Sequence, residues 1–210
     1  MNGIIHFDTF LFTGILLNLT PGNDTIFILT RSISEGKKAG IVSALGISTG
    51  SVIQTILAAF GLSIIIAKSI FLFNLIKYAG AVYLIYIGVN MLLVKNFLTA
   101  NIKKTNVTNY LKIYREAIIT NLLNPKVALF FIAFLPQFID PLSKNTVLAF
   151  LTLGFTFTTT GTIWCFILAI FASAIFVRLK RNAKVSAYIT KFCGFTLIAL
   201  GIKVAMINKK

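Results

Sequence analysis

The chain has 210 residues, of which 57% are hydrophobic and only 12% are charged. Soluble globular domains carry about 25% charged residues, so this composition excludes a soluble enzyme or binding domain and favours a membrane protein. The formal net charge is +15, but the basic residues fall in short segments between apolar stretches, which argues against a nucleic-acid partner.

Six apolar stretches are long enough to cross a bilayer, which takes about 20 residues of helix. They cover residues 4–29, 41–67, 70–94, 117–139, 147–177 and 187–207. Little sequence remains for a soluble domain. We therefore expect an all-α polytopic membrane protein with six transmembrane helices.

The first stretch is interrupted in its middle by Asn18-Leu-Thr-Pro-Gly-Asn-Asp-Thr25. Pro21 removes a backbone donor and Gly22 adds flexibility, and hydrocarbon cannot solvate the carbonyl groups that such a break frees. The break is therefore expected inside the protein, beside a water-filled cavity. Thr20 and Pro21 are typical of an N-cap and a first helical position, so we expect a second helix to begin there with free N–H groups facing the cavity.

The fourth stretch carries the same kind of interruption, at Asn124-Pro125-Lys126. Asn124 is a typical N-cap before a proline, and Lys126 takes the place of the charged residue. Paired interruptions in corresponding segments of two halves are the best indication of a transporter binding site that a sequence offers.

The two halves resemble each other in further details. Lys77-Tyr-Ala-Gly80 followed by Gly88 has a counterpart in Lys191-Phe-Cys-Gly194 followed by Gly201. Three spans per half is an odd number, so the second repeat is expected to be inverted relative to the first, with the broken first and fourth helices meeting near the midplane. The predicted units are residues 1–94, a basic cytoplasmic linker 95–112, and residues 113–210.

Small residues within the spans predict close helix packing. Gly46 and Gly50 are four residues apart and share one helix face, which lets a neighbouring helix approach. We expect the same packing role for four more glycines, which are Gly80, Gly88, Gly194 and Gly201. Gln54 carries an amide within a span, and both a helix-to-helix hydrogen bond and a substrate contact remain open for it.

Basic residues concentrate in every second segment between spans, at 31–38, 95–115 and 178–186. Basic loops stay on the cytoplasmic side, where they also meet anionic membrane lipid. This alternation predicts a multi-pass protein with both termini outside.

Asp24 and Lys126 are the two ionisable residues deep within spans. Charges there cost roughly 2.5–3.5 kcal/mol each on insertion, so they tend to be paired and functional, although an ion pair that only stabilises the fold remains an alternative. Asp24 is the candidate for proton coupling. Two helix N-termini, an acid and a base suit a zwitterion, which favours an amino acid as substrate. The candidate binding residues are Thr20, Pro21, Gly22, Asn23, Asp24, Gln54, Asn124, Pro125 and Lys126.

Four motifs together resemble the lysine exporter (LysE/RhtB) family of amino-acid efflux proteins. They are Thr20-Pro-Gly-Asn-Asp24, Gly46-Ile-Ser-Thr-Gly50, Asn124-Pro-Lys126 and Phe134-Leu-Pro-Gln-Phe138. The resemblance runs over nearly the whole chain, although the family usually has a second proline where this chain has Asn23. It implies a bacterial inner-membrane protein that exports an amino acid or derivative such as homoserine, threonine, lysine or leucine by proton antiport, with the central site at the first and third motifs.

Other classes fit the sequence less well. A divalent metal-cation exporter of related architecture would need several inward carboxylates, and Asp24 is the only convincing one. An intramembrane enzyme would need a nucleophile–base pair or two acids, and no such set is evident; neither a metal site nor a cofactor is indicated. The sequence leaves open which amino acid is exported and whether the protein forms a homo-oligomer.

Overall fold

The computed structural model describes residues 3–68, 109–140, 143, 145–181 and 183–206, with positions 75, 78, 81–82, 85–86, 88–90 and 92–93. Every element of this described part is helical, as expected. In chain order these are α1 (Phe7–Leu19), α2 (Asn23–Glu35), α3 (Lys37–Lys68), α5 (Tyr110–Leu122), α6 (Pro125–Leu129), a π-helix η1 (Phe130–Phe134), a 3₁₀ helix η2 (Leu135–Phe138), α7 (Thr146–Arg181) and α8 (Ala183–Met206).

Two of the described helices are long and apolar enough to cross a membrane unaided, Lys37–Gly61 of α3 and Thr146–Ala172 of α7. A third crossing is available if α5 and the run Pro125–Phe138 act as one broken span, bent by 45° between them. These findings agree with a polytopic membrane protein. The six-helix inverted repeat stays a prediction, because most of the predicted span 70–94, including Gly80, lies outside the described residues.

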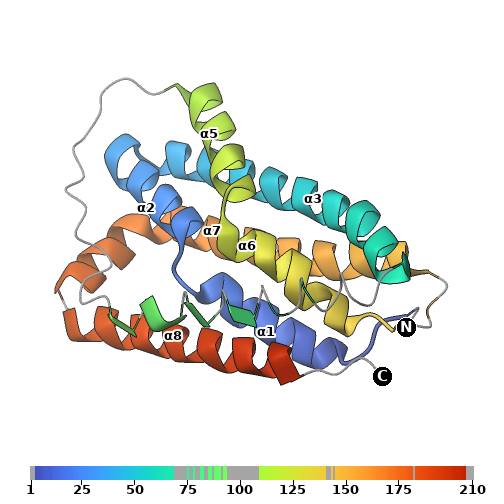
Figure 1. Cartoon of the computed structure of the whole chain (residues 1–210). Helices are drawn as coiled ribbons and strands as arrows, with labels where there is room; N and C mark the ends of the chain where they lie inside the picture. The colour runs from blue at the N-terminus through green and yellow to red at the C-terminus, as the bar shows by residue number, and fades with distance from the viewer. Residues whose placement is uncertain are drawn as a thin grey trace.

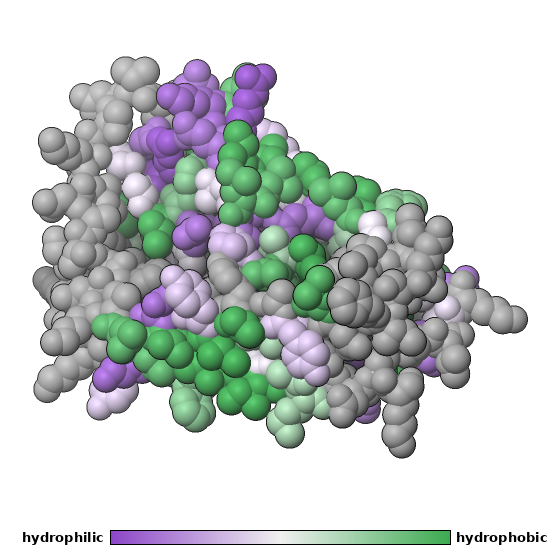
Figure 2. Space-filling model, in the orientation of Figure 1, coloured by the Kyte–Doolittle hydropathy of each residue, from purple (hydrophilic) through white to green (hydrophobic). Residues whose placement is uncertain are grey.

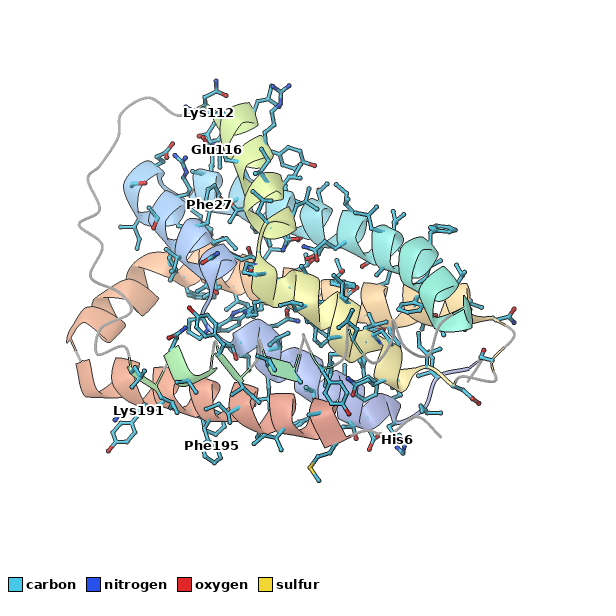
Figure 3. The ribbon with its side chains drawn as sticks, in the orientation of Figure 1. His6, Phe27, Lys112, Glu116, Lys191 and Phe195 are labelled. Carbon is cyan, nitrogen blue, oxygen red and sulfur yellow. The ribbon has the colours of Figure 1, made fainter. Side chains whose placement is uncertain are left out.

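Large hydrophobic side chains lie exposed along the outer faces of the helices. Phe195 on α8 points outward and is 71% exposed, and Phe12 on α1 is 65% exposed (Figure 3). Hydrophobic residues predominate over α8, whereas hydrophilic ones gather where α5 begins (Figure 2). Side chains of this kind are suited to lipid rather than water.

Where the structure describes them, the segments that were predicted as basic loops are largely helix ends, whereas residues 95–108 of the predicted linker 95–112 lie outside the described residues. Only Gly36 separates α2 from α3, α5 begins inside 95–115, and α7 and α8 extend into 178–186. Lys and Arg are strong helix formers, so a basic segment continues the helix as far as a breaker allows. Gly36 interrupts the helix between α2 and α3, because its φ of 92° is one that only glycine adopts readily.

The buried core has two parts. The first, which we call the aromatic cluster, packs α1 against η1, η2 and α7, and Phe130 and Phe157 stack in it with ring centroids 4.2 Å apart. Its aromatic members are Phe10, Phe130, Phe131, Phe134, Phe138, Phe150 and Phe157. The second, the aliphatic cluster, joins α2, α3, α5 and α7 and contains Ile28, Leu29, Ala44, Ile47, Ala117, Cys165, Leu168, Ala169 and Ala172.

The residues before α1 form backbone contacts with the end of η2. The N–H of Ile5 donates to the carbonyl of Phe138 at 2.9 Å, and Ile4 and Ile139 form an isolated antiparallel bridge. The start of α1 and the end of α8 lie at the same end of the molecule (Figure 1).

Glycines mark the closest helix contacts. A Cβ added to Gly46 would lie 2.5 Å from both Ala117 Cβ and the backbone oxygen of Tyr114, so α3 and α5 touch there. A Cβ on Gly50 would lie 2.8 Å from Asn121 on the same helix.

The second set of glycines lies between α8 and the described positions of segment 81–93. A Cβ on Gly88 would lie 2.6 Å from the oxygen of Gly194, and one on Gly194 would lie 2.7 Å from the oxygen of Gly88. Gly201 is equally close to the oxygen of Ala81. The two backbones therefore meet directly along this contact.

We expect Gly46→Ala to lower the melting temperature of the purified protein in detergent. The added methyl group meets a backbone atom that moves only with its helix, and such overpacking costs about 1–3 kcal/mol. Gly61→Ala is the matched control on the same helix, because no atom lies within 4 Å of its added Cβ. Equal melting temperatures for the two variants would contradict the packing argument.

Candidate functional site

The first helix break lies between Leu19, where α1 ends, and Asn23, where α2 begins. Thr20 caps the end of α1: its hydroxyl donates to the carbonyl of Leu16 at 2.8 Å, and its N–H donates to the same carbonyl at 3.0 Å. The N-cap of α2 is Gly22, which has no side chain to bind the first-turn N–H groups. The prediction that α2 begins at Thr20-Pro21 was therefore wrong, because the Thr20 hydroxyl binds back to the preceding turn.

The second break lies between Leu122, the last residue of α5, and Pro125, the first of α6. Asn124 is the N-cap, and its side-chain oxygen accepts a hydrogen bond from the N–H of Lys126 at 3.1 Å. This cap confirms the sequence prediction. Asn124 is 2% exposed, whereas its neighbours Leu123 and Pro125 are exposed, so the break is buried on the side of Asn124 only.

The two breaks lie side by side, joined by Lys126 (Figure 1). Its ammonium group donates to the carbonyl of Thr20 at 2.8 Å and to that of Leu17 at 3.2 Å. A cation is favourable at the carbonyl end of a helix, and here it satisfies groups that the break of α1 sets free. Gly22 lies beside the same side chain, since a Cβ on it would be 3.2 Å from Nζ.

Asp24 makes the reciprocal contact, from α2 to α5. It lies in the first turn of α2, where a negative charge is favoured. Its Oδ2 accepts a hydrogen bond from Nδ2 of Asn121 at 2.9 Å, and the charge of Lys126 acts on it from the other break. Each charged residue thus binds a group that belongs to the opposite break.

A small cavity adjoins this pair, with a volume of about 30 Å³. That is room for roughly one or two water molecules. The cavity lies between the two parts of the core, because Val127 and Phe157 of the aromatic cluster and Ile47 and Cys165 of the aliphatic cluster all line it. The other lining residues are Asn18, Asp24, Thr25, Ser48, Ser51, Lys126, Thr158, Gly161, Thr162 and Trp164.

Of the residues predicted from the sequence, Asp24 and Lys126 line the cavity, while Thr20 and Asn124 position Lys126 from outside it. Gln54 does not line it: its amide donates to the carbonyl of Asn121 at 2.8 Å and so joins α3 to α5. Asn23 is exposed and lies in an outer groove instead.

The site residues predicted from the sequence did not include the wall that α3 and α7 contribute to the cavity. Its polar members are Ser48 and Ser51 on α3 and Thr158 and Thr162 on α7. They recur at intervals of three or four residues, which is the spacing of one helix face. This periodicity within two apolar spans was the sequence signal that could have identified the wall. Ser48 and Thr162 bind each other at 2.8 Å across the two helices.

Asn18 fixes the end of α1 against α7. Its side-chain nitrogen donates to the hydroxyl of Thr160 at 3.1 Å and to the carbonyl of Phe157 at 3.3 Å. Gly161 leaves space for this contact, since a Cβ there would lie 3.0 Å from the Asn18 oxygen.

An ion-pair group lies further along α2, away from the cavity. Arg31 pairs with Glu35 on its own helix and with Glu116 on α5, and its guanidinium lies 5.4 Å from the ring centroid of Phe27 (Figure 3). An outer groove of about 340 Å³ runs beside it between α2 and α5. It is lined by Asn23, Ile26, Phe27, Thr30, Arg31 and Thr120.

Comparison with known proteins finds a family of translocators. The model of the LysE type translocator family matches residues 15–207. An uncharacterized membrane protein of Bacillus subtilis strain 168, YrhP, is 31% identical over 199 residues, which cover 91% of this chain and 94% of the relative.

Leucine efflux proteins of Salmonella choleraesuis and Salmonella typhimurium are each 32% identical over 175 residues, covering 83% of this chain and 82% of theirs. No solved structure matches the chain. The family model matches nearly the full length of the chain, and the relatives are more than 30% identical over most of both sequences. The chain therefore belongs to the LysE type translocator family.

Proposed function

We propose that this protein exports an amino acid or an amino-acid derivative across the bacterial inner membrane by proton antiport. The observation that carries the proposal is the placement of Asp24 and Lys126, one on each of two facing helix breaks and both lining one cavity. An amino acid presents an ammonium and a carboxylate on neighbouring atoms, and this site offers a group of opposite charge for each.

The ammonium of the substrate is expected at Asp24. The Oδ1 atom of this residue is buried and has no hydrogen-bond partner in the described part of the chain. A carboxylate oxygen in that state is the natural acceptor for an incoming cation, and the same oxygen is available to a proton when the substrate has left. Alternation between the two ligands is the basis of the proposed antiport.

The carboxylate of the substrate is expected at the N-terminus of α2. No side chain caps that helix, so its first N–H groups are available to an anion. Lys126 adds positive charge next to it, beside Gly22.

The cavity has to widen before it can hold a substrate. Its volume of about 30 Å³ is far below the roughly 300–1,000 Å³ of ordinary ligand pockets. In transporters with paired broken helices, rocking of one unit against the other opens such a site to one side at a time. The contacts that cross between the breaks, Lys126 to Thr20 and Asn121 to Asp24, are those that this motion has to change.

The rival proposal, a divalent metal-cation exporter, draws less support. Such a cation prefers several oxygen ligands with carboxylates among them. Asp24 is the one carboxylate that lines the cavity within the part of the chain described, whereas Lys126 next to it would repel a metal ion.

A resistance screen tests the proposed function. Cells that overproduce the protein are grown against a panel of toxic amino-acid analogues, with leucine analogues first because two relatives are leucine efflux proteins. We expect the inhibitory concentration of one or a few analogues to rise, and the rise to vanish with an empty vector. Resistance to divalent cations without resistance to any analogue would support the metal alternative and overturn the proposal.

A further inference from the structure

Buried polar atoms without partners occur in the lining of the cavity and at the second helix break beside it. In the described residues six buried side-chain atoms have no hydrogen-bond partner, and four of them belong to Asp24, Asn121, Asn124 and Trp164. Such groups are rare in proteins and each is costly to leave unpaired. The side chain of Asn124 is in hydrogen-bonding reach of Asp24, so the indole N–H of Trp164 is the atom in the cavity lining whose missing partner indicates a molecule that binds there.

The four atoms divide into acceptors and donors. The acceptors are Oδ1 of Asp24 and Oδ1 of Asn121, and the donors are Nδ2 of Asn124 and Nε1 of Trp164. A zwitterionic head group needs both kinds, because its ammonium only donates and its carboxylate only accepts. Trp164 is the most informative of the four, since an indole N–H can act only as a donor.

Trp164 lies on the α7 wall of the cavity that Asp24 and Lys126 also line. The next residue, Cys165, lines the same cavity. A buried tryptophan normally finds a partner for its N–H, and packing against the aliphatic cluster accounts for its ring but not for this atom.

Two of the donors near Asp24, the ammonium of Lys126 and Nδ2 of Asn121, already have acceptors. The ammonium of Lys126 donates to the carbonyls of Thr20 and Leu17, and Nδ2 of Asn121 donates to Asp24. A substrate carboxylate that enters from the α7 side therefore meets the indole N–H as a donor that no other group uses.

We propose that Trp164 is a substrate-binding residue, whose indole N–H donates a hydrogen bond to the carboxylate of the amino acid held at Asp24. This inference rests on the proposed function and adds a residue from α7 to the site formed by the two breaks. It assigns recognition of the substrate carboxylate jointly to the N-terminus of α2 and to Trp164.

The chain offers a direct readout, because Trp164 is its single tryptophan. Purified protein in detergent is titrated with L-leucine and then with each of the other common amino acids, while the tryptophan emission is recorded. We expect a saturable change in intensity or wavelength with at least one of them. If the emission changes with none of the amino acids, the inference about Trp164 is wrong. If the same protein still confers resistance to amino-acid analogues, the proposed function stands and only this inference is overturned.

Trp164→Phe tests the hydrogen bond itself, since it keeps an aromatic ring and removes the N–H. Binding of radiolabelled L-leucine is competed with unlabelled L-leucine and with L-leucinamide, which lacks the carboxylate. We expect the wild type to prefer leucine, and the variant to lose about tenfold or more of that preference, as for a hydrogen bond to a charged group.

Tyr114→Phe is the control for this measurement. It removes a hydroxyl that binds Thr49 at 2.8 Å, away from the cavity lining. It should leave the preference for leucine over leucinamide unchanged. A preference for leucine that is the same in Trp164→Phe and in the wild type, with the variant still binding leucine, would assign Trp164 to packing only.

Discussion

We expect Asp24→Asn to abolish export while the protein remains in the membrane. Asparagine has the same shape and keeps an oxygen that can accept the hydrogen bond from Asn121, so the break between α1 and α2 is retained. The variant removes the negative charge to which the proposed mechanism binds the substrate ammonium and the transported proton in turn. Removing one partner from a buried charge pair costs about 2–5 kcal/mol, so we expect the export rate to fall by a factor of roughly 30 or more.

The measurement uses proteoliposomes loaded with labelled amino acid, and immunoblots to confirm equal amounts of protein. An imposed pH gradient should accelerate export by the wild type and have no effect on the variant. Asp8→Asn is the matched control, because Asp8 is exposed in the first turn of α1 and does not line the cavity. Export by Asp24→Asn at the wild-type rate would remove this residue from the mechanism.

The breaks and the two charges were predictable from the sequence, whereas their partners were not. Proline and an intramembrane charge are strong local signals, because each carries a cost that hydrocarbon does not relieve. Nothing local indicates that Lys126 binds the carbonyls of Leu17 and Thr20, which precede it by more than 100 residues. That contact depends on how α6 packs against α1.

Thr20 shows how one local signal supports two structures. A threonine before proline suits the start of a helix, yet its hydroxyl also binds the carbonyl four residues earlier and so ends one. The carbonyl end of α1 is stabilised by Lys126 from the other break, and this tertiary contact favours the second outcome.

The α7 wall of the cavity could not be predicted from the sequence, for a similar reason. Threonines are frequent along this helix, and Thr152 and Thr156 bind carbonyls of their own helix, as most threonines in membrane spans do. Which of them face the cavity depends on the rotation of α7, and that is set by contacts such as Gly154 against Thr55, where a Cβ would lie 2.4 Å from Cγ2. Composition alone carries no information about this rotation.

Lys126→Met should abolish export and also lower the melting temperature of the protein. The variant leaves the carbonyls of Thr20 and Leu17 without their donor and leaves Asp24 buried without its countercharge. Leaving a buried polar group without its hydrogen-bond partner costs about 1–3 kcal/mol, and more for a charged group. Lys112→Met is the control, since Lys112 is exposed near the start of α5 (Figure 3), and we expect it to change neither property.

The double variant Asp24→Asn/Lys126→Met separates binding from folding. Neither charge is then left uncompensated, and replacing both members of a buried pair is often close to neutral for stability. We therefore expect the melting temperature to recover in part while export stays abolished, because both groups that are proposed to recognise the ammonium and the carboxylate of the substrate are gone. If export recovers together with stability, the pair serves only to hold the two breaks together, and a zwitterion site at this position is wrong.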